Sequence, residues 1–297
     1  MNRETQFGSW RRFIGMVVCA VLISGQTVSI ALAQERFKEP LHRVAKAKFE
    51  GRPGVKQHPI DPAISLAQSC LIDFRKNVKD YQSVVVKRER IDGTLGNYEY
   101  MLLKIRNERS QNGRLVQPFG VYGYFLKPDD VKGREILYVK GANKDKMLAH
   151  EGTNNLLNKI GSIWLKPDGP IAMKGQRYPV YEIGIENLIV KLLERAGRDR
   201  TRGECNVEFR KGAVVNGSRC TMVQVTHPVR RAFFDFHIAQ IYIDDQHNMP
   251  IRYAAYGWPT KEGGRPPVLE EYTYINVKLN PGFADIDFDH NNPAYGF

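Results

Sequence analysis

The chain has 297 residues, of which 42% are hydrophobic, and it carries a formal net charge of +12 at pH 7. This length allows a substantial hydrophobic core, in one large or two small domains. No apolar run beyond residue 33 is long enough to cross a bilayer, so we expect the mature chain to be soluble or peripheral to a membrane.

The N-terminus is typical of a secretory signal peptide spanning residues 1–33. An arginine pair at 11–12 precedes an apolar run over residues 13–24, which is short for a bilayer span. The tripeptide Ala-Leu-Ala at 31–33 fits a signal peptidase site, so we expect the mature chain to begin at Gln34. A retained membrane anchor is the alternative. Export predicts a periplasmic or secreted protein.

The positive charge is spread along the chain, which is typical of a general solvating surface. Export predicts that no nucleic acid is a partner. An anionic envelope surface, made of lipid headgroups, phosphates or acidic glycans, is the alternative partner for this charge.

The first elements are a linker and a helix. Residues 34–60 are basic, contain several prolines and glycines, and predict a flexible linker. Asp61 is a good N-cap and Pro62 suits a first helical turn. Apolar residues then recur at helical spacing as far as Val78, which predicts an amphipathic helix of about 17 residues.

Strands follow this helix. Asp92-Gly93 is a hairpin turn signal between two of them. Short apolar or alternating runs predict strands over residues 84–86, 98–106, 122–126, 134–140 and 146–150. Residues 151–181 are rich in glycine and proline and predict no regular element.

A second helix is predicted over residues 182–196, ending at Gly197. Its apolar residues recur at helical spacing, with Glu182 in the first turn and Arg195 in the last, as the helix dipole favours. Further strands are predicted over residues 205–210, 213–216, 219–226, 236–244, 250–256 and 272–279.

Sequential strands joined by short turns predict an antiparallel sheet. With two helices, the fold class is α+β: a large curved antiparallel sheet, or half-barrel, wrapping one or two helices. Residues 61–297 are expected to form a single domain. The many aromatic residues in the strands either fill an ordinary core or line a cavity for an apolar ligand.

Three cysteines follow the signal. Cys205 and Cys220 flank a predicted hairpin, so in an oxidising compartment we expect them to form a disulfide that stabilises by about 3 kcal/mol. Cys70 lies on the apolar face of the first helix and is expected to be buried and free. The cysteine spacing differs from that of a zinc site, and we predict no metal there.

Few residues point to catalysis. The sequence contains no nucleophile elbow, metalloprotease, phosphate-loop or dinucleotide-binding motif, and we predict no cofactor. His150 stands beside Glu151, and Glu270 stands beside Glu271. Carboxylates and a histidine are the groups of acid–base hydrolysis, so His150, Glu270 and Glu271 are candidate catalytic residues. The competing interpretation places them at ordinary strand ends.

The C-terminal run Asp285–Asp289 has acidic residues at the first, third and fifth positions, like the start of a calcium loop. His290 replaces the glycine that such a loop needs at its sixth position, and Gly296 replaces the final glutamate. An alternating edge strand explains this run equally well.

Several motifs occur in one order along the chain: Lys87–Gly93, Lys132–Val139, Leu148–Gly152, Gln176–Pro179, Pro250–Tyr253, Glu270–Tyr274 and Asp287–Asp289. They resemble a bacterial exported family known as domain of unknown function 1571, over residues 63–297. The resemblance implies no established activity. The order of helices and strands is also similar to the Lol-type periplasmic lipoprotein carriers, in which a half-closed barrel holds acyl chains; this is an analogy of fold.

We therefore expect a non-enzymatic envelope protein that binds a lipid, an acylated protein or another apolar ligand in a sheet-lined cavity of roughly a few hundred Å³. Trp164, Tyr178 and Trp258 lie in or beside glycine- and proline-rich loops and are candidates for its rim. An exported hydrolase using Glu270 or Glu271 with His150 is one alternative, and a protein-binding scaffold is another.

Overall fold

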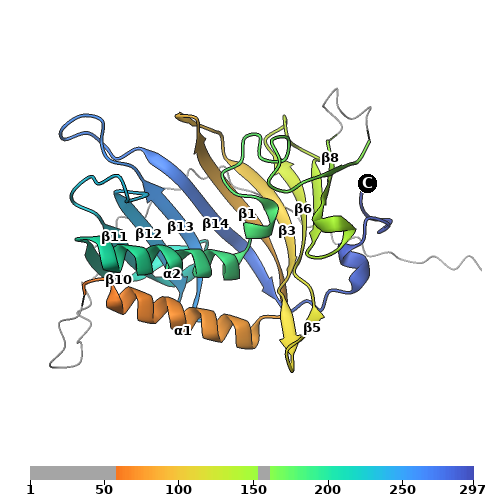
Figure 1. The fold of residues 1–297 in the computed structure, drawn as a ribbon, viewed down its shortest axis with the longest axis horizontal. Coiled ribbons are helices and arrows are strands. Elements are labelled where there is room, and N and C mark those ends of the chain that lie inside the picture. Colours follow the sequence, from red (N-terminus) through yellow and green to blue (C-terminus); the bar gives the residue numbers. More distant parts are fainter. Residues whose placement is uncertain (1–57, 153–160) are drawn as a thin grey trace, which may run out of the picture. The chain divides into compact units, whose positions relative to one another are not determined.

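Two amphipathic helices lie side by side across one face of a large antiparallel sheet in the computed structural model (Figure 1). The structure describes residues 58–152 and 161–297, all of which belong to one compact unit, residues 40–297. The expected α+β class is confirmed, with the sheet open between its edge strands. The expected signal peptide and nearly all of the expected linker lie outside the described residues.

Helix α1 spans Asp61–Asn77 and buries Cys70 and Phe74 against the sheet. The predicted cap is wrong, because Ile60 occupies the N-cap position and makes no side-chain cap. The Asp61 carboxylate instead accepts a hydrogen bond from the backbone of His58 and pairs with Arg200 of the second helix.

Helix α2 spans Ile185–Arg202, later in its start and its end than predicted. It begins after Gly184, whose φ of 117° favours glycine, and the Ile185 amide donates to the Tyr81 hydroxyl at 2.8 Å. The helix continues past Gly197 because the next helical turn contacts a residue outside the helix. There Asp199 lies 3.2 Å from the buried ring of His227.

The main sheet has 12 strands, with β10 at one edge and β9 at the other. The short strand β2 pairs with β1 and lies off the main strand order. Its strand order from edge to edge is β10-β11-β12-β13-β14-β1-β3-β6-β7-β8-β9. The strands are β1 Asp80–Ile91, β2 Thr94–Leu95, β3 Glu99–Arg106, β6 Gly120–Lys127, β7 Glu135–Val139, β8 Met147–His150, β9 Ile163–Leu165, β10 Asn206–Val215, β11 Ser218–Thr226, β12 Ile238–Asp244, β13 Met249–Tyr256 and β14 Val268–Leu279.

A separate hairpin is formed by β4 Arg109–Gln111 and β5 Arg114–Gln117. In the main sheet, the last strand, β14, pairs with the first, β1, so the first and last strands lie side by side in the interior of the sheet. Within the ranges that the structure describes, no helix has the length and apolar character needed to cross a membrane.

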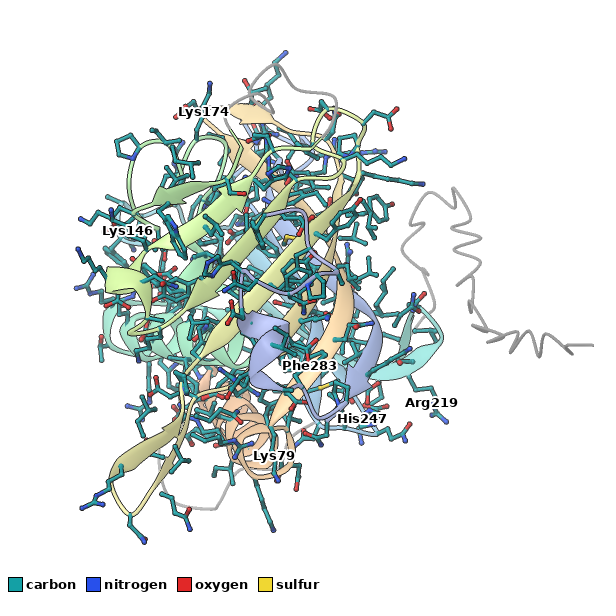
Figure 2. All side chains as sticks on the ribbon, turned by 90° about the vertical axis from the view of Figure 1, so that its right-hand side faces the viewer. Lys79, Lys146, Lys174, Arg219, His247 and Phe283 are labelled. Carbon is teal, nitrogen blue, oxygen red and sulfur yellow. The ribbon has the colours of Figure 1, made fainter. Side chains whose placement is uncertain are left out.

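The two faces of the sheet carry different cores. The inner face, which we define as the one that contacts α1 and α2, holds the main core; Phe74 meets the ring edge of Tyr81 there at 5.9 Å. The outer face of β6–β8 carries a smaller core closed by the C-terminal segment, where Tyr295 stacks on Tyr122 at 3.8 Å. Figure 2 shows this segment toward the viewer, with Phe283 labelled.

The C-terminal aspartates form neither a strand nor a calcium loop. Residues Asp285–Phe288 form a short 3-10 helix, in which Asp285 pairs with Arg106 and Asp287 with Lys104. Across the described ranges, no group of three or more histidine, cysteine, aspartate or glutamate side chains is arranged to hold a metal ion.

The predicted Cys205–Cys220 disulfide is wrong, because the hairpin turns at Asn216-Gly217 and not midway between the cysteines. Gly212, which lies midway between the two cysteines, forms a bulge inside β10. Cys220 therefore lies opposite Ala213, eight residues from Cys205, a separation of roughly 25 Å along the strand. Both thiols are buried and free, as is Cys70, for which this was expected.

Candidate functional site

A cavity of about 100 Å³ lies between α2 and the inner face of the sheet. We call it the central cavity. The sheet contributes an apolar wall of Val85, Met101, Leu103, Phe125 and Ile136. On the side opposite the sheet, the cavity is lined by three apolar side chains from α2 and the segment before it, Ile183, Leu188 and Leu192. Odd-numbered residues of β1 face inward. The alternation of this strand therefore puts Val85 in the apolar wall and the charged residues Lys87 and Glu89 at the next two inward-facing positions.

One end of the central cavity is polar. The residues that line this end combine charges, an amide and phenols: Lys87, Glu89, Gln176, Tyr178, Glu182, Lys191, Arg195, Tyr253 and Tyr272. The cavity is therefore amphiphilic, with an apolar body and a polar end.

The buried carboxylate of Glu270, only 2% exposed, organises this polar end. It accepts hydrogen bonds from the hydroxyls of Tyr178 at 3.0 Å and Tyr253 at 3.3 Å, and lies 3.4 Å from an Arg195 nitrogen. Arg177 approaches its other oxygen at 3.0 Å. A buried carboxylate is tolerated only when it is paired and hydrogen-bonded in this way. We call these residues, with Tyr272, the Glu270 cluster.

A second set of charges adjoins the Glu270 cluster. Tyr272 donates its hydroxyl hydrogen to Glu89, which connects the two sets. The Lys87 ammonium lies 3.6 Å from Glu89 and 3.0 Å from Glu99, and donates to the amide oxygen of Gln176 at 2.5 Å. Positive and negative groups thus alternate around the polar end.

The tyrosines of the Glu270 cluster stay protonated. Burial raises the pKa of Tyr253 well above its ordinary value, and the negative charge of Glu270 raises it further. Burial by itself lowers the pKa of Arg195, but Tyr253, Tyr178 and Glu270 outweigh this effect and raise it. The tyrosines are therefore hydrogen-bond donors and Arg195 is a permanent cation, which suits binding and positioning.

A smaller apolar cavity of about 60 Å³ lies under the other side of α2. We call it the side cavity. It is bounded by α1, by α2 and by β11 and β12, with Val223, Val225 and Ile241 in its wall. Leu192 and Arg195 line both the central and the side cavity. The sequence predicted one space of a few hundred Å³; the structure has two smaller spaces because side chains of α2 project between them.

The candidate catalytic residues do not converge. Glu270 and Glu271 are neighbours on a strand and face opposite sides, Glu271 pairing with Arg252 at 3.0 Å on the outer face. His150 ends β8, five strands from β14, which is a separation of roughly 24 Å. Its ring lies 3.3 Å from the Ser162 hydroxyl. The alternative interpretation, a hydrolase using Glu270 or Glu271 with His150, therefore has no cleft that these residues share.

Of the three expected rim residues, only Tyr178 lines the central cavity. Trp164 lies in β9 and packs with the outer core, its ring 5.7 Å from that of His290. Trp258 follows β13 and lies beside His237, with ring centroids 5.7 Å apart. Glycine- and proline-rich surroundings thus identified one lining residue and two packing residues.

Sequence reasoning missed Lys87, Glu89 and Arg195. Lys87 and Glu89 share the inward-facing positions of β1 with Val85, so charges at core positions were the available signal. Arg195 was assigned to the last turn of its helix, where a cation complements the dipole. Because α2 continues to Arg202, Arg195 is an interior residue of the helix, and its side chain turns toward the sheet.

Residues 78–297 match the family described as Protein of unknown function (DUF1571). The match covers most of the chain, and the protein therefore belongs to this family, as its motifs predicted. No protein with a curated description matches the chain.

Several solved structures are similar to this chain at low sequence identity. They include a DUF1329 family protein from Desulfovibrio piger (12% identity, TM-score 0.38, 79% of this chain and 98% of that one). A LolA superfamily protein from Nitrosomonas europaea is also similar (10%, 0.29, 75% and 97%), as is the Mycobacterium tuberculosis lipoprotein LppX (16%, 0.41, 77% and 100%).

Proposed function

We propose that this protein is a non-enzymatic binder of an apolar or amphiphilic ligand, held between helix α2 and the inner face of the sheet. It acts in the cell envelope after removal of residues 1–33, as one domain over residues 61–297. The ligand is a lipid or the acyl chain of another protein. The observation that carries the proposal is the central cavity, which has an apolar body and one polar end.

The side cavity extends the space available to a chain. Leu192 stands between the two cavities and lines both of them. A change of its side-chain rotamer costs little compared with the burial of several methylene groups, each worth about 0.8 kcal/mol. An apolar chain can therefore run from the central into the side cavity once Leu192 turns aside.

The polar end favours recognition over chemistry. Its charged groups are paired with one another, and its tyrosines are protonated donors. A nucleophile held by a base and an orienting third group is the arrangement that hydrolysis requires. Here the only histidine candidate, His150, lies several strands away.

A titration with an environment-sensitive fatty-acid probe, 11-(dansylamino)undecanoic acid, tests this proposal. Leu192→Ala joins the two cavities and should tighten probe binding, whereas Leu192→Trp fills them and should weaken it by about tenfold or more. Leu193→Ala removes an equal volume from the same helix without lining either cavity, and should leave the affinity within about twofold. Equal probe affinity in the two Leu192 variants would refute the proposed location.

A further inference from the structure

An open groove of about 600 Å³ lies at the beginning of α2, outside the central cavity. We call it the entrance groove. The end of α1, the base of the β4–β5 hairpin, the turn after β7 and residues 166–168 border it. Of the residues that the structure describes, it shares only Ile183 and Gly184 with the lining of the central cavity, so most of its described surface has no role in the function proposed above.

Three aromatic rings follow one another along the entrance groove. The ring of Phe119 lies 6.4 Å from that of Tyr138, which lies 6.3 Å from that of Tyr181. Tyr181 is 38% exposed, whereas the other two rings are buried. An exposed ring backed by buried rings is a rigid platform with an apolar face and a polar tip.

The charges of the entrance groove balance. Among the described residues, its lining contains four cations, Arg75, Lys140, Lys144 and Lys166, and four carboxylates, Glu108, Asp145, Asp168 and Glu186. Three of the cations have a carboxylate partner within the groove, at 2.7 Å for Arg75–Glu186, 2.7 Å for Lys140–Glu108 and 3.5 Å for Lys166–Asp168. On a chain with a formal charge of +12, the groove is a locally neutral site.

A strained turn presents the remaining charges. Asn143, Lys144 and Asp145 all have positive φ, at 52°, 58° and 55°, a conformation that costs non-glycine residues energy. The Asp145 carboxylate accepts hydrogen bonds from the amide of Gly141 at 2.6 Å and from the hydroxyl of Tyr138 at 3.4 Å. Strain of this kind is concentrated at functional sites.

We propose that the entrance groove binds an uncharged oligosaccharide. Sugar hydroxyls both donate and accept hydrogen bonds, so they can contact a paired lysine and its carboxylate without separating them. The C–H face of a sugar ring matches the exposed ring of Tyr181. Among the groove's charged groups, an anionic ligand can gain Lys144, and a cationic ligand Asp145, without separating one of its three ion pairs; every further charge contact has to disrupt one.

Isothermal titration of the mature chain with triacetylchitotriose and maltotriose tests this proposal, with trigalacturonate as the anionic comparison. We expect saturable binding of at least one neutral sugar and weaker binding of trigalacturonate. Tyr181→Ala should weaken the neutral sugar about tenfold, and Tyr181→Phe should restore it. Tyr98→Ala, which removes an equally exposed tyrosine outside the groove, should have no effect.

Glu108→Gln provides an independent readout. This change leaves Lys140 without its carboxylate, so affinity for trigalacturonate should rise while that for the neutral sugar changes little. Absence of binding by both neutral sugars would overturn the proposal, as would stronger binding of trigalacturonate to the unmodified chain. An affinity for the neutral sugar that is unchanged in the Tyr181→Ala variant would also overturn it. None of these results bears on the central cavity, which the dansyl probe reports.

Discussion

Replacing Glu270 with glutamine tests how the Glu270 cluster is held together. The substitution keeps the size of the side chain but removes the charge that Arg195 and Arg177 face. Removing one partner of a buried ion pair costs about 3–5 kcal/mol. The side chain of Arg195 is 18% exposed and that of Arg177 is 31% exposed, so water screens part of the lost interaction energy. We expect Glu270→Gln to lower the free energy of unfolding by about 3 kcal/mol.

Urea unfolding followed by circular dichroism measures this loss as a shift of the midpoint at constant slope. Glu186→Gln is the matched control, because its partner Arg75 is 57% exposed and such a pair contributes less than about 1 kcal/mol. A Glu270→Gln variant as stable as the unmodified protein would refute our account of the cluster. Equal losses in both variants would also contradict it.

Three further predictions follow from buried groups. Burial raises the pKa of the Cys70 and Cys220 thiols to about 12 and that of Cys205 to about 11. The native mature protein at pH 8 should therefore resist iodoacetamide, and the urea-unfolded mature protein, which lacks Cys19, should incorporate three labels. Unfolded thiols ionise near pH 8.5 and the folded ones do not, so stability should be fully present below that pH and fall as pH rises toward 11. The loss should be about 2 kcal/mol per thiol at pH 10, and an unchanged urea midpoint between pH 8 and 10 would contradict this. A Cβ at Gly120 would lie 2.9 Å from the ring of Phe288, so Gly120→Val should release the C-terminal segment to limited proteolysis, and a resistant variant would argue against this packing.

Local sequence patterns predicted most of the helices and strands, whereas the candidate site depends on contacts between residues far apart in the sequence. The alternation over residues 272–279 corresponds to the last two thirds of β14, and the 3.6-residue period after Asp61 corresponds to α1. These periodicities depend on which face of one element is buried, so they are visible in a short window. The family motifs likewise identified the family.

The register of β10 and β11 was not predictable from the same window, because two turn signals compete there. Gly212 and Asn216-Gly217 both tolerate positive φ, and only the paired structure shows that the first forms a bulge and the second the turn. The position of Cys220 relative to Cys205 depends on that choice.

The Glu270 cluster was also beyond local reasoning. Its members come from β13, β14, α2 and the segment before α2, and they meet because β14 packs beside β1 beneath the helix. No spacing along the chain encodes that meeting. The available sign was the presence of Lys87 and Glu89 at inward-facing strand positions, since charges at core positions require buried partners.

Identification of the bound molecule tests the central claim most directly. The mature protein would be purified from the native envelope without detergent, extracted with organic solvent and examined by mass spectrometry. Our account predicts an apolar or amphiphilic molecule that copurifies with the unmodified protein and is depleted from the Leu192→Trp variant, in which both cavities are filled. An extract with no such molecule, or with the same amount from both proteins, would contradict a ligand held between α2 and the sheet.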